Sequence, residues 1–135
     1  MRGAIHHIDL TVRDPDASRA FYDAVLGFMG YTLKDDHQRG FDMDLQTPEG
    51  FCSVGVMRAS GANAERTHDR YSPGLHHIAW TASSRADVDA LHALLKQIGA
   101  TILDPPAEYP QYGAGYYAVF FADPDGLKLE YVFKP

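Results

Sequence analysis

The stretch HIDLTV at residues 7–12 recurs as HIAWTA at residues 77–82, and both copies open on a histidine. A second related pair, PEGF at residues 48–51 and PDGL at residues 124–127, stands toward the end of each half. Internal self-similarity of this kind is the sequence signature of a repeated structural unit. The chain is therefore predicted to contain two related modules, each beginning with a strand that opens on a histidine.

Composition narrows the class of protein. The chain has 135 residues, which is enough for one domain with a sizeable core. Its net charge of −6 argues against a nucleic-acid partner, because such proteins gather Lys and Arg to neutralise phosphates. The single cysteine, Cys52, excludes an intrachain disulfide, and no apolar stretch has the length of a signal peptide or membrane span. We expect a soluble cytoplasmic protein without a membrane partner.

The first module is predicted to run strand, helix, strand, strand, strand over residues 4–59. Residues 4–12 alternate as a strand does, and the apolar residues of 17–26 recur at helical spacing. Asp16 or Ser18 is expected to cap this helix, and Gly27 is expected to end it. The three further strands are expected at residues 29–35, 40–47 and 51–58.

The second module is predicted to repeat this order over residues 74–134, after a polar connector. A strand at 75–82 leads into a helix at 85–97 that ends at Gly99. Three strands follow, at residues 100–104, 115–122 and 127–133. The segment between the first two is rich in proline and tyrosine, and it is expected to be a loop that acts either as a lid or as a cover for the sheet.

Neither module has enough strands to hide both faces of its sheet. The two are therefore expected to pair within one domain, residues 1–135, as an open, curled, barrel-like sheet with the helices outside. This is an α+β fold made of two βαβββ modules. On the last strand, Leu129 and Tyr131 share one face, so Glu130 is expected to point away from the core-like residues, toward a pocket.

His7, His77 and Glu130 are residues of metal-ligand type. A lone strand histidine is more often a packed or surface residue, but two histidines at matched positions of a repeat, together with a carboxylate, suggest a metal site. Such a set leaves a divalent ion with open positions for water or substrate oxygens, and the ion can be iron, manganese, nickel or zinc. Strand alternation is expected to point the neighbouring His6 and His76 to the opposite face, as flanking or structural residues.

Several longer stretches, spread over nearly the full length of the chain, are similar to those of one known protein family. They are HIDLTVRD at 7–14, SRAFY at 18–22, VLGF at 25–28, HIAW at 77–80 and FADPDGLKLE at 121–130. With these stretches the chain resembles the vicinal oxygen chelate superfamily, also called the glyoxalase/bleomycin-resistance/dioxygenase superfamily. The resemblance implies a divalent metal that binds vicinal oxygens of a small molecule, with His7, His77 and Glu130 as its ligands. It also implies a homodimer, in which the three ligands come from one chain or from two.

The chain departs from the pattern of glyoxalase I. Those proteins use a fourth ligand, a glutamate on the closing strand of the first module. Superposing the PEG stretch at residues 48–50 on the PDG stretch at residues 124–126 puts Val54 opposite Glu130, with Gly55 beside it. The sequence therefore predicts a site with three protein ligands. It also makes a glutathione-dependent glyoxalase activity a weaker hypothesis.

Three hypotheses of function remain. The leading one is a glyoxalase-like, metal-dependent lyase or isomerase whose catalytic base is unassigned. The second is a non-haem iron dioxygenase, for which Tyr116 or Tyr117 would have to replace the expected tyrosine at position 120. The third is a metal-free binding protein of the bleomycin-resistance type. The residues expected to line the small-molecule site are aromatic: Trp80, Tyr112, Tyr116 and Phe120.

Overall fold

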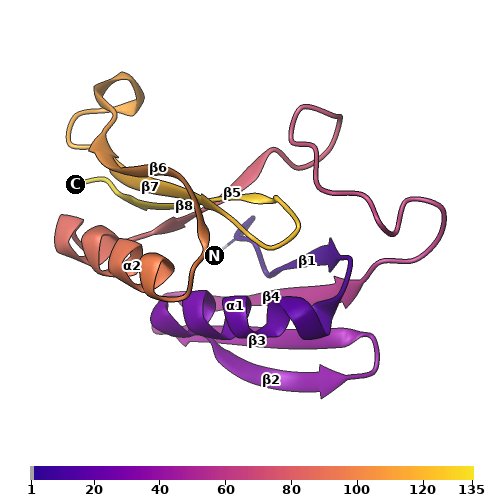
Figure 1. The fold of residues 1–135 in the computed structure, drawn as a ribbon. Helices are drawn as coiled ribbons and strands as arrows, with labels where there is room; N and C mark the ends of the chain where they lie inside the picture. Colours follow the sequence, from indigo (N-terminus) through magenta and orange to yellow (C-terminus); the bar gives the residue numbers. More distant parts are fainter. Residues whose placement is uncertain (1) are drawn as a thin grey trace. The chain divides into compact units, whose positions relative to one another are not determined.

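The structure, a computed structural model, describes residues 2–135 (Figure 1). The chain divides into two compact units, of which the first reaches to Arg66 and the second starts at Thr67. Each unit holds one module with the same order of elements: a strand, a helix and three strands. The predicted α+β class with two repeated βαβββ modules is confirmed. The pairing of the modules within one domain stays a prediction.

The first unit is a four-stranded sheet with one helix. In chain order its elements are β1 (His7–Val12), α1 (Pro15–Phe28), β2 (Thr32–His37), β3 (Gly40–Thr47) and β4 (Gly50–Arg58). The strand order is β1-β4-β3-β2, and β1 runs parallel to β4 while the other pairs are antiparallel. Among the described residues this sheet is open, with β1 and β2 at its edges.

The second unit repeats this topology. Its elements are β5 (His77–Thr81), α2 (Arg85–Gln97), β6 (Thr101–Glu108), the short 3₁₀ helix η1 (Pro110–Tyr112), β7 (Tyr117–Ala122) and β8 (Lys128–Phe133). The strand order is β5-β8-β7-β6, again with the first strand parallel to the last. The strand that carries Glu130 therefore pairs directly with the strand that opens on His77.

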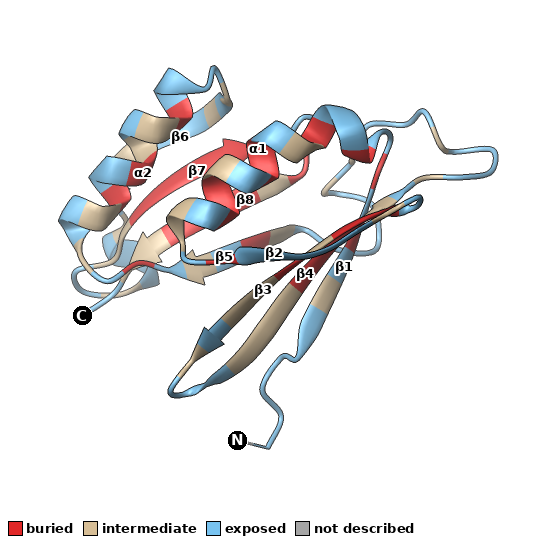
Figure 2. Ribbon diagram, turned by 90° about the horizontal axis from the view of Figure 1, so that it is seen from below, coloured by how far each residue is buried: buried red, intermediate tan, exposed pale blue. Residues whose placement is uncertain are grey.

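Each helix covers one face of the sheet in its own unit. Helix α1 packs on β2, β3 and β4, and α2 packs on β6, β7 and β8. Figure 2 shows the buried side of each helix and the buried residues of β7 and β8. In α2 the buried residues are Val88, Leu91 and Leu95, whose spacing of three and four places them on one face. No helix within residues 2–135 is both long and apolar enough to cross a membrane.

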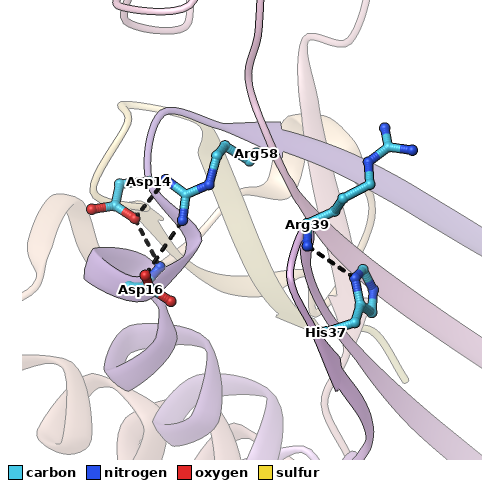
Figure 3. Close-up of polar contacts among 5 residues, drawn as sticks. All are labelled: Asp14, Asp16, His37, Arg39 and Arg58. Carbon is cyan, nitrogen blue, oxygen red and sulfur yellow. Dashed lines mark hydrogen bonds and ion pairs between the residues drawn. The ribbon is translucent and has the colours of Figure 1, made fainter.

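Helix α1 begins earlier than the sequence predicts. Its N-cap is Asp14 rather than Asp16 or Ser18, because Asp14 has an extended backbone and its Oδ1 accepts the backbone N–H of Asp16 at 3.0 Å. Ser18 is buried within the helix. The guanidinium of Arg58, at the end of β4, pairs with Asp14 at 3.2 Å and Asp16 at 3.3 Å (Figure 3). These contacts tie the start of the helix to the sheet.

Helix α1 also ends later than the sequence predicts. Gly27 lies inside the helix, which continues to Phe28 and is capped by Met29. Gly30 then adopts a φ of +95°, the left-handed conformation that only glycine reaches at low cost. The chain-reversing glycine is therefore Gly30. The end of α2 agrees with the prediction, since its C-cap is Ile98 and Gly99 has a φ of +70°.

Much of the proline-rich segment is a strand rather than a loop. Strand β6 continues through Pro105 and Pro106 to Glu108, with register shifts that begin after Ile102 and Asp104. Proline lacks the N–H that a central strand needs, but β6 lies at the edge of its sheet, where the missing donor is tolerated. The remaining loop, with η1, is shorter than expected. Its proposed action as a lid stays a prediction.

Candidate metal centre

Glu130 lies on the side of its sheet that faces away from α2. The hydroxyl of its neighbour Tyr131 donates to Asp87 on α2 at 2.7 Å, so alternation turns Glu130 to the opposite face, as predicted. The side chain of Glu130 is only 3% exposed, and its Oε2 lies 3.2 Å from His77 Nε2. Its Oε1 accepts a hydrogen bond from the hydroxyl of Tyr116. A buried carboxylate with a partner on each oxygen is held in one orientation.

Tyr116 is the tyrosine that the structure places beside the glutamate. Burial raises the pKa of the Tyr116 phenol, and the hydrogen bond to Glu130 raises that pKa further. Tyr116 is therefore protonated at neutral pH and serves as a donor. The hydroxyl of Tyr117 points elsewhere and donates to Asp89 on α2 at 2.7 Å. Of the two tyrosines that the sequence left open, only Tyr116 contacts Glu130.

His77 has a partner at each ring nitrogen. Its Nδ1 lies 2.7 Å from Nδ1 of His76, and its Nε2 faces Glu130 Oε2. A neutral imidazole carries one proton. If that proton is on Nδ1, Nε2 and the carboxylate are two acceptors that need a cation between them. If it is on Nε2, a bound metal ion would displace it. The gap between Nε2 and Oε2 is thus a place for a proton or a metal cation.

The spacing of these two atoms fits a transition metal. Bonds of about 2.1 Å from a divalent ion to nitrogen and to oxygen would span the 3.2 Å separation at an angle of roughly 100°. That angle lies between the octahedral and tetrahedral values. One imidazole and one carboxylate are also ligands that Fe(II), Mn(II), Ni(II) and Zn(II) accept. His77 and Glu130 are therefore suited to hold such an ion.

The expectation that His6 and His76 point away from their neighbours is wrong. Strands β1 and β5 begin at His7 and His77, so the preceding histidines lie outside the strands, where alternation does not hold. His6 Nδ1 lies 3.1 Å from His7 Nδ1, and the pair at 76 and 77 repeats this contact. Each preceding ring can accept the Nδ1 proton of the next, which leaves Nε2 of the second ring for a metal. The histidine doublet in both copies was the sequence signal for this arrangement.

His7 lies in the first unit. It is exposed at the start of β1, in register with Ser53. Its repeat partner in the second unit, His77, is the one that the structure brings to a carboxylate. The participation of His7 in the same metal site stays a prediction.

Three of the four predicted lining residues gather in one aromatic cluster, which we define as Tyr109, Tyr112, Tyr116 and Phe120. The rings of Tyr109 and Tyr112 stack with 5.8 Å between centroids, and Tyr109 meets Phe120 edge-on at 5.3 Å. Phe120 is in register with Glu130, so this cluster borders the carboxylate. The fourth residue, Trp80, is in register with Tyr131 and lies on the opposite face.

The position of the first module that corresponds to Glu130 is Gly55, not Val54. Glu130 is in register with Ala79, two residues after His77, and Gly55 is in register with Asp9, two residues after His7. The alignment of the two turn motifs therefore differs from the strand register by one residue. No carboxylate is attached at this position, as predicted, since glycine has no side chain.

A second group of possible ligands lies on the first sheet. One ligand atom from each of Asp35, His37 and Asp42 lies within 4.8 Å of the others. His37 Nδ1 accepts the backbone N–H of Arg39 at 3.2 Å, so the neutral ring carries its proton on Nε2 (Figure 3). That Nε2 faces Asp42 Oδ2 at 3.5 Å. His37 Nε2 therefore faces Asp42, and a metal ion bound at this group would have to displace the Nε2 proton.

Comparisons with known proteins identify the family of this chain. The family model described as the Glyoxalase/Bleomycin resistance protein/Dioxygenase superfamily matches residues 4–131. The chain is 33% identical to the uncharacterized protein YqjT of Bacillus subtilis over 128 residues, which cover 95% of this chain and 97% of that protein.

Solved structures show the same fold. A glyoxalase-like protein of Bacillus halodurans matches with a TM-score of 0.82 and 30% identity, over 98% of this chain and 97% of that one. Lactoylglutathione lyase of Agrobacterium tumefaciens matches with a TM-score of 0.63 and 20% identity, over 97% and 93%, a likeness of fold alone. On the family match over nearly its whole length, this chain belongs to the Glyoxalase/Bleomycin resistance protein/Dioxygenase superfamily.

Proposed function

We propose that the protein is a metal-dependent enzyme of the lyase or isomerase type that acts on a small molecule with vicinal oxygens. His7, His77 and Glu130 would hold the divalent ion. The observation that carries the proposal is the convergence of His77 Nε2 and Glu130 Oε2 at 3.2 Å, on a carboxylate that is nearly inaccessible to water. Burying a carboxylate costs several kcal/mol unless a partner or a metal compensates it, so such a site is maintained for a purpose.

The chain's own residues define what this site does. A bound divalent ion supplies Lewis-acid stabilisation of negative charge on substrate oxygens. Tyr116 holds Glu130 in place through Oε1, which leaves Oε2 directed at His77. The aromatic cluster supplies an apolar wall next to the carboxylate and excludes water from it. Lys128, two residues before Glu130 and on the same face, lies 4.4 Å from the Phe120 ring centroid and adds a positive charge for an anionic substrate.

Elemental analysis tests the proposal directly. Protein purified without added metal or chelator is compared with the variants His77→Ala and Glu130→Ala, after each variant has been shown to fold by circular dichroism. We expect about one transition metal per chain in the wild type and loss of that metal in both variants. A wild type that holds no metal and takes up none when it is added would refute the catalytic proposal and leave a metal-free binding protein.

A non-haem iron dioxygenase is the second candidate, and Tyr116 is the observation that favours it. That phenol contacts the proposed ligand Glu130, although it stands at a different sequence position from the expected tyrosine. The identity of the metal separates the two candidates. Iron, with oxygen consumed in the presence of a catechol, supports the dioxygenase, whereas nickel, manganese or zinc without oxygen uptake supports the lyase or isomerase.

We further propose that the protein works as a cytoplasmic homodimer. Mixing a His7→Ala chain with a Glu130→Ala chain tests whether the ligands come from two subunits. If they do, each mixed dimer regains one intact site and the mixture recovers metal binding. If all three ligands belong to one chain, the mixture stays as poor in metal as the separate variants.

A further inference from the structure

Arg70 has a buried nitrogen without a partner. It lies in the segment that precedes β5, within the second unit. Its Nε is buried and has no hydrogen-bond partner among residues 2–135. Its guanidinium carbon lies over the Tyr71 ring, 4.9 Å from the centroid, and an aromatic face does not replace the missing acceptor. Buried polar groups are nearly always hydrogen-bonded, so this donor calls for an acceptor from outside the chain.

The segment around Arg70 is fixed by hydrogen bonds within the second unit. The backbone N–H of His68 donates to the carbonyl of Asp125, in the turn before β8, at 2.9 Å. The Nε2 of His68 lies 2.9 Å from the carbonyl oxygen of Leu75, close to the start of β5. The Arg70 side chain is therefore presented from a loop that is attached at both of its ends.

Lys128 adds a second positive charge next to the candidate metal centre. It is in register with His77 on the neighbouring strand, and it shares a face of β8 with Glu130, two residues further along. Its ammonium lies 4.4 Å from the centroid of the Phe120 ring. This ring accepts no ordinary hydrogen bond, so the ammonium N–H groups can donate to an anion.

Both cations lie near His76. The Tyr71 ring, next in sequence to Arg70, meets the His76 ring edge-on at 5.9 Å, and His76 contacts His77. Burial lowers the pKa of His76 most, and neighbouring positive charges lower this pKa further. In decreasing order of effect, these charges belong to His77, Lys128, Arg70 and His68. A chain with a net charge of −6 thus gathers positive charge beside its candidate metal centre.

Resting on the proposed function, we propose that Arg70 and Lys128 bind an oxyanion of the substrate, a carboxylate or a phosphate group, beside the metal. The Nε–H and one terminal N–H of a guanidinium form a fork that matches two oxygens of such a group, and a lysine adds a point charge. The substrate class is then a small organic acid or phosphate ester. Its vicinal oxygens bind the metal, and its separate acidic group binds the two cations.

Titration of the chelator-treated full chain with inorganic phosphate tests this subsite without metal. Calorimetry at constant ionic strength compares the wild type with Arg70→Gln and Lys128→Gln, and acetate is titrated in parallel to identify the preferred oxyanion. The charge control is Lys96→Gln, because Lys96 is exposed in the last turn of α2, the helix that covers the opposite face of the sheet. We expect about tenfold weaker binding in the first two variants, the loss of a charge-assisted hydrogen bond. The control should change affinity by no more than about twofold.

A second variant of Arg70 separates its charge from its shape. Arg70→Lys keeps the positive charge and loses the fork, so we expect a loss of phosphate affinity between those of the wild type and Arg70→Gln. Without phosphate, the melting temperature of Arg70→Gln should not fall below that of the wild type, because the variant loses no hydrogen bond of Nε. An Arg70→Lys variant that binds phosphate as tightly as the wild type would overturn the role of the fork.

Two probes test the subsite with metal restored and oxygen excluded. Catechol and 3,4-dihydroxybenzoate share one pair of vicinal oxygens, and only the second carries a carboxylate. We expect this carboxylate to tighten binding about tenfold in the wild type and in Lys96→Gln, and to give no such advantage in Arg70→Gln. The ratio of the two affinities cancels any effect of a variant on the metal itself.

The outcomes separate this proposal from the proposed function. If phosphate binding depends on Arg70 and Lys128 but the wild type takes up no metal, the proposed function fails and the anion subsite stands as part of a binding protein. If metal binds, but phosphate does not bind or binds Arg70→Gln and Lys128→Gln as tightly as Lys96→Gln, only the subsite is overturned. Equal ratios for the two catechols in the wild type and Arg70→Gln would overturn its place beside the metal.

Discussion

The hydrogen bond from Tyr116 to Glu130 gives the sharpest prediction for stability. Tyr116→Phe keeps the ring, and with it the packing in the aromatic cluster, and removes only the hydroxyl that donates to Glu130 Oε1. The side chain of Glu130 is 3% exposed, so water cannot easily replace the lost donor. The change therefore leaves one oxygen of a buried carboxylate without its partner.

The expected magnitude follows from this burial. A hydrogen bond to a charged group contributes about 1.5–3 kcal/mol, and a buried acceptor left unsatisfied costs a similar amount. We expect the free energy of unfolding of the metal-free protein to fall by about 2 kcal/mol, which for a chain of this size lowers the melting temperature by roughly 5–10 °C. Metal affinity should fall about tenfold, because an outer partner of a ligand carboxylate is lost.

Chemical denaturation of chelator-treated protein, followed by circular dichroism, measures this effect. Tyr117→Phe is the matched control: its hydroxyl donates to Asp89 in an exposed contact on the other face, and its loss should cost no more than about 1 kcal/mol. Equal losses for the two variants, or a loss below about 0.5 kcal/mol for Tyr116→Phe, would show that the contact with Glu130 does not hold the carboxylate.

The remaining predictions concern residues of helix α2 and its N-cap. Burial alone would raise the pKa of Asp87, but hydrogen bonds from Tyr131 and Ser83 bring it below its ordinary value. The carboxylate therefore stabilises the fold above about pH 4, and this contribution is lost as the pH falls through the folded-state pKa. Acid titrations of stability should be flatter for Asp87→Asn than for the wild type. Leu91→Ala, at a fully buried position, should cost about 2–5 kcal/mol in urea unfolding, and the half-buried Leu94→Ala clearly less. Ser84→Ala should cost about 1 kcal/mol, because the Ser84 hydroxyl accepts the Asp87 N–H at 3.1 Å and caps the helix.

The fold was predictable because the same sequence pattern occurs in both halves of the chain. Hydrophobic spacing predicted both helices, and the matched histidine stretches predicted that the two halves share one topology, which the orders β1-β4-β3-β2 and β5-β8-β7-β6 confirm. Boundaries were less accurate. The cap at Asp14 was missed although it is a local contact with the backbone of Asp16. The passage of β6 through Pro105 depends on the place of β6 at the edge of its sheet, which local patterns do not reveal.

The candidate site was only partly predictable. Alternation along β8 was enough to turn Glu130 away from the helix, because the period of a strand is fixed. The contact of His76 with His77 was missed because the strand begins at His77, two residues later than expected. Trp80, a predicted lining residue, is in register with Tyr131 and lies on the opposite face of the sheet from Glu130.

By itself the sequence determined the repeat, the fold class and the family, because these depend on patterns that are local and periodic. The choice of Tyr116 over Tyr117 and the equivalence of Gly55 with Glu130 were decided only by the tertiary structure. Each of them depends on the register between strands that are distant in the chain. A shift of one residue in that register moves a side chain to the opposite face, and hydrogen bonding and packing across the sheet fix it.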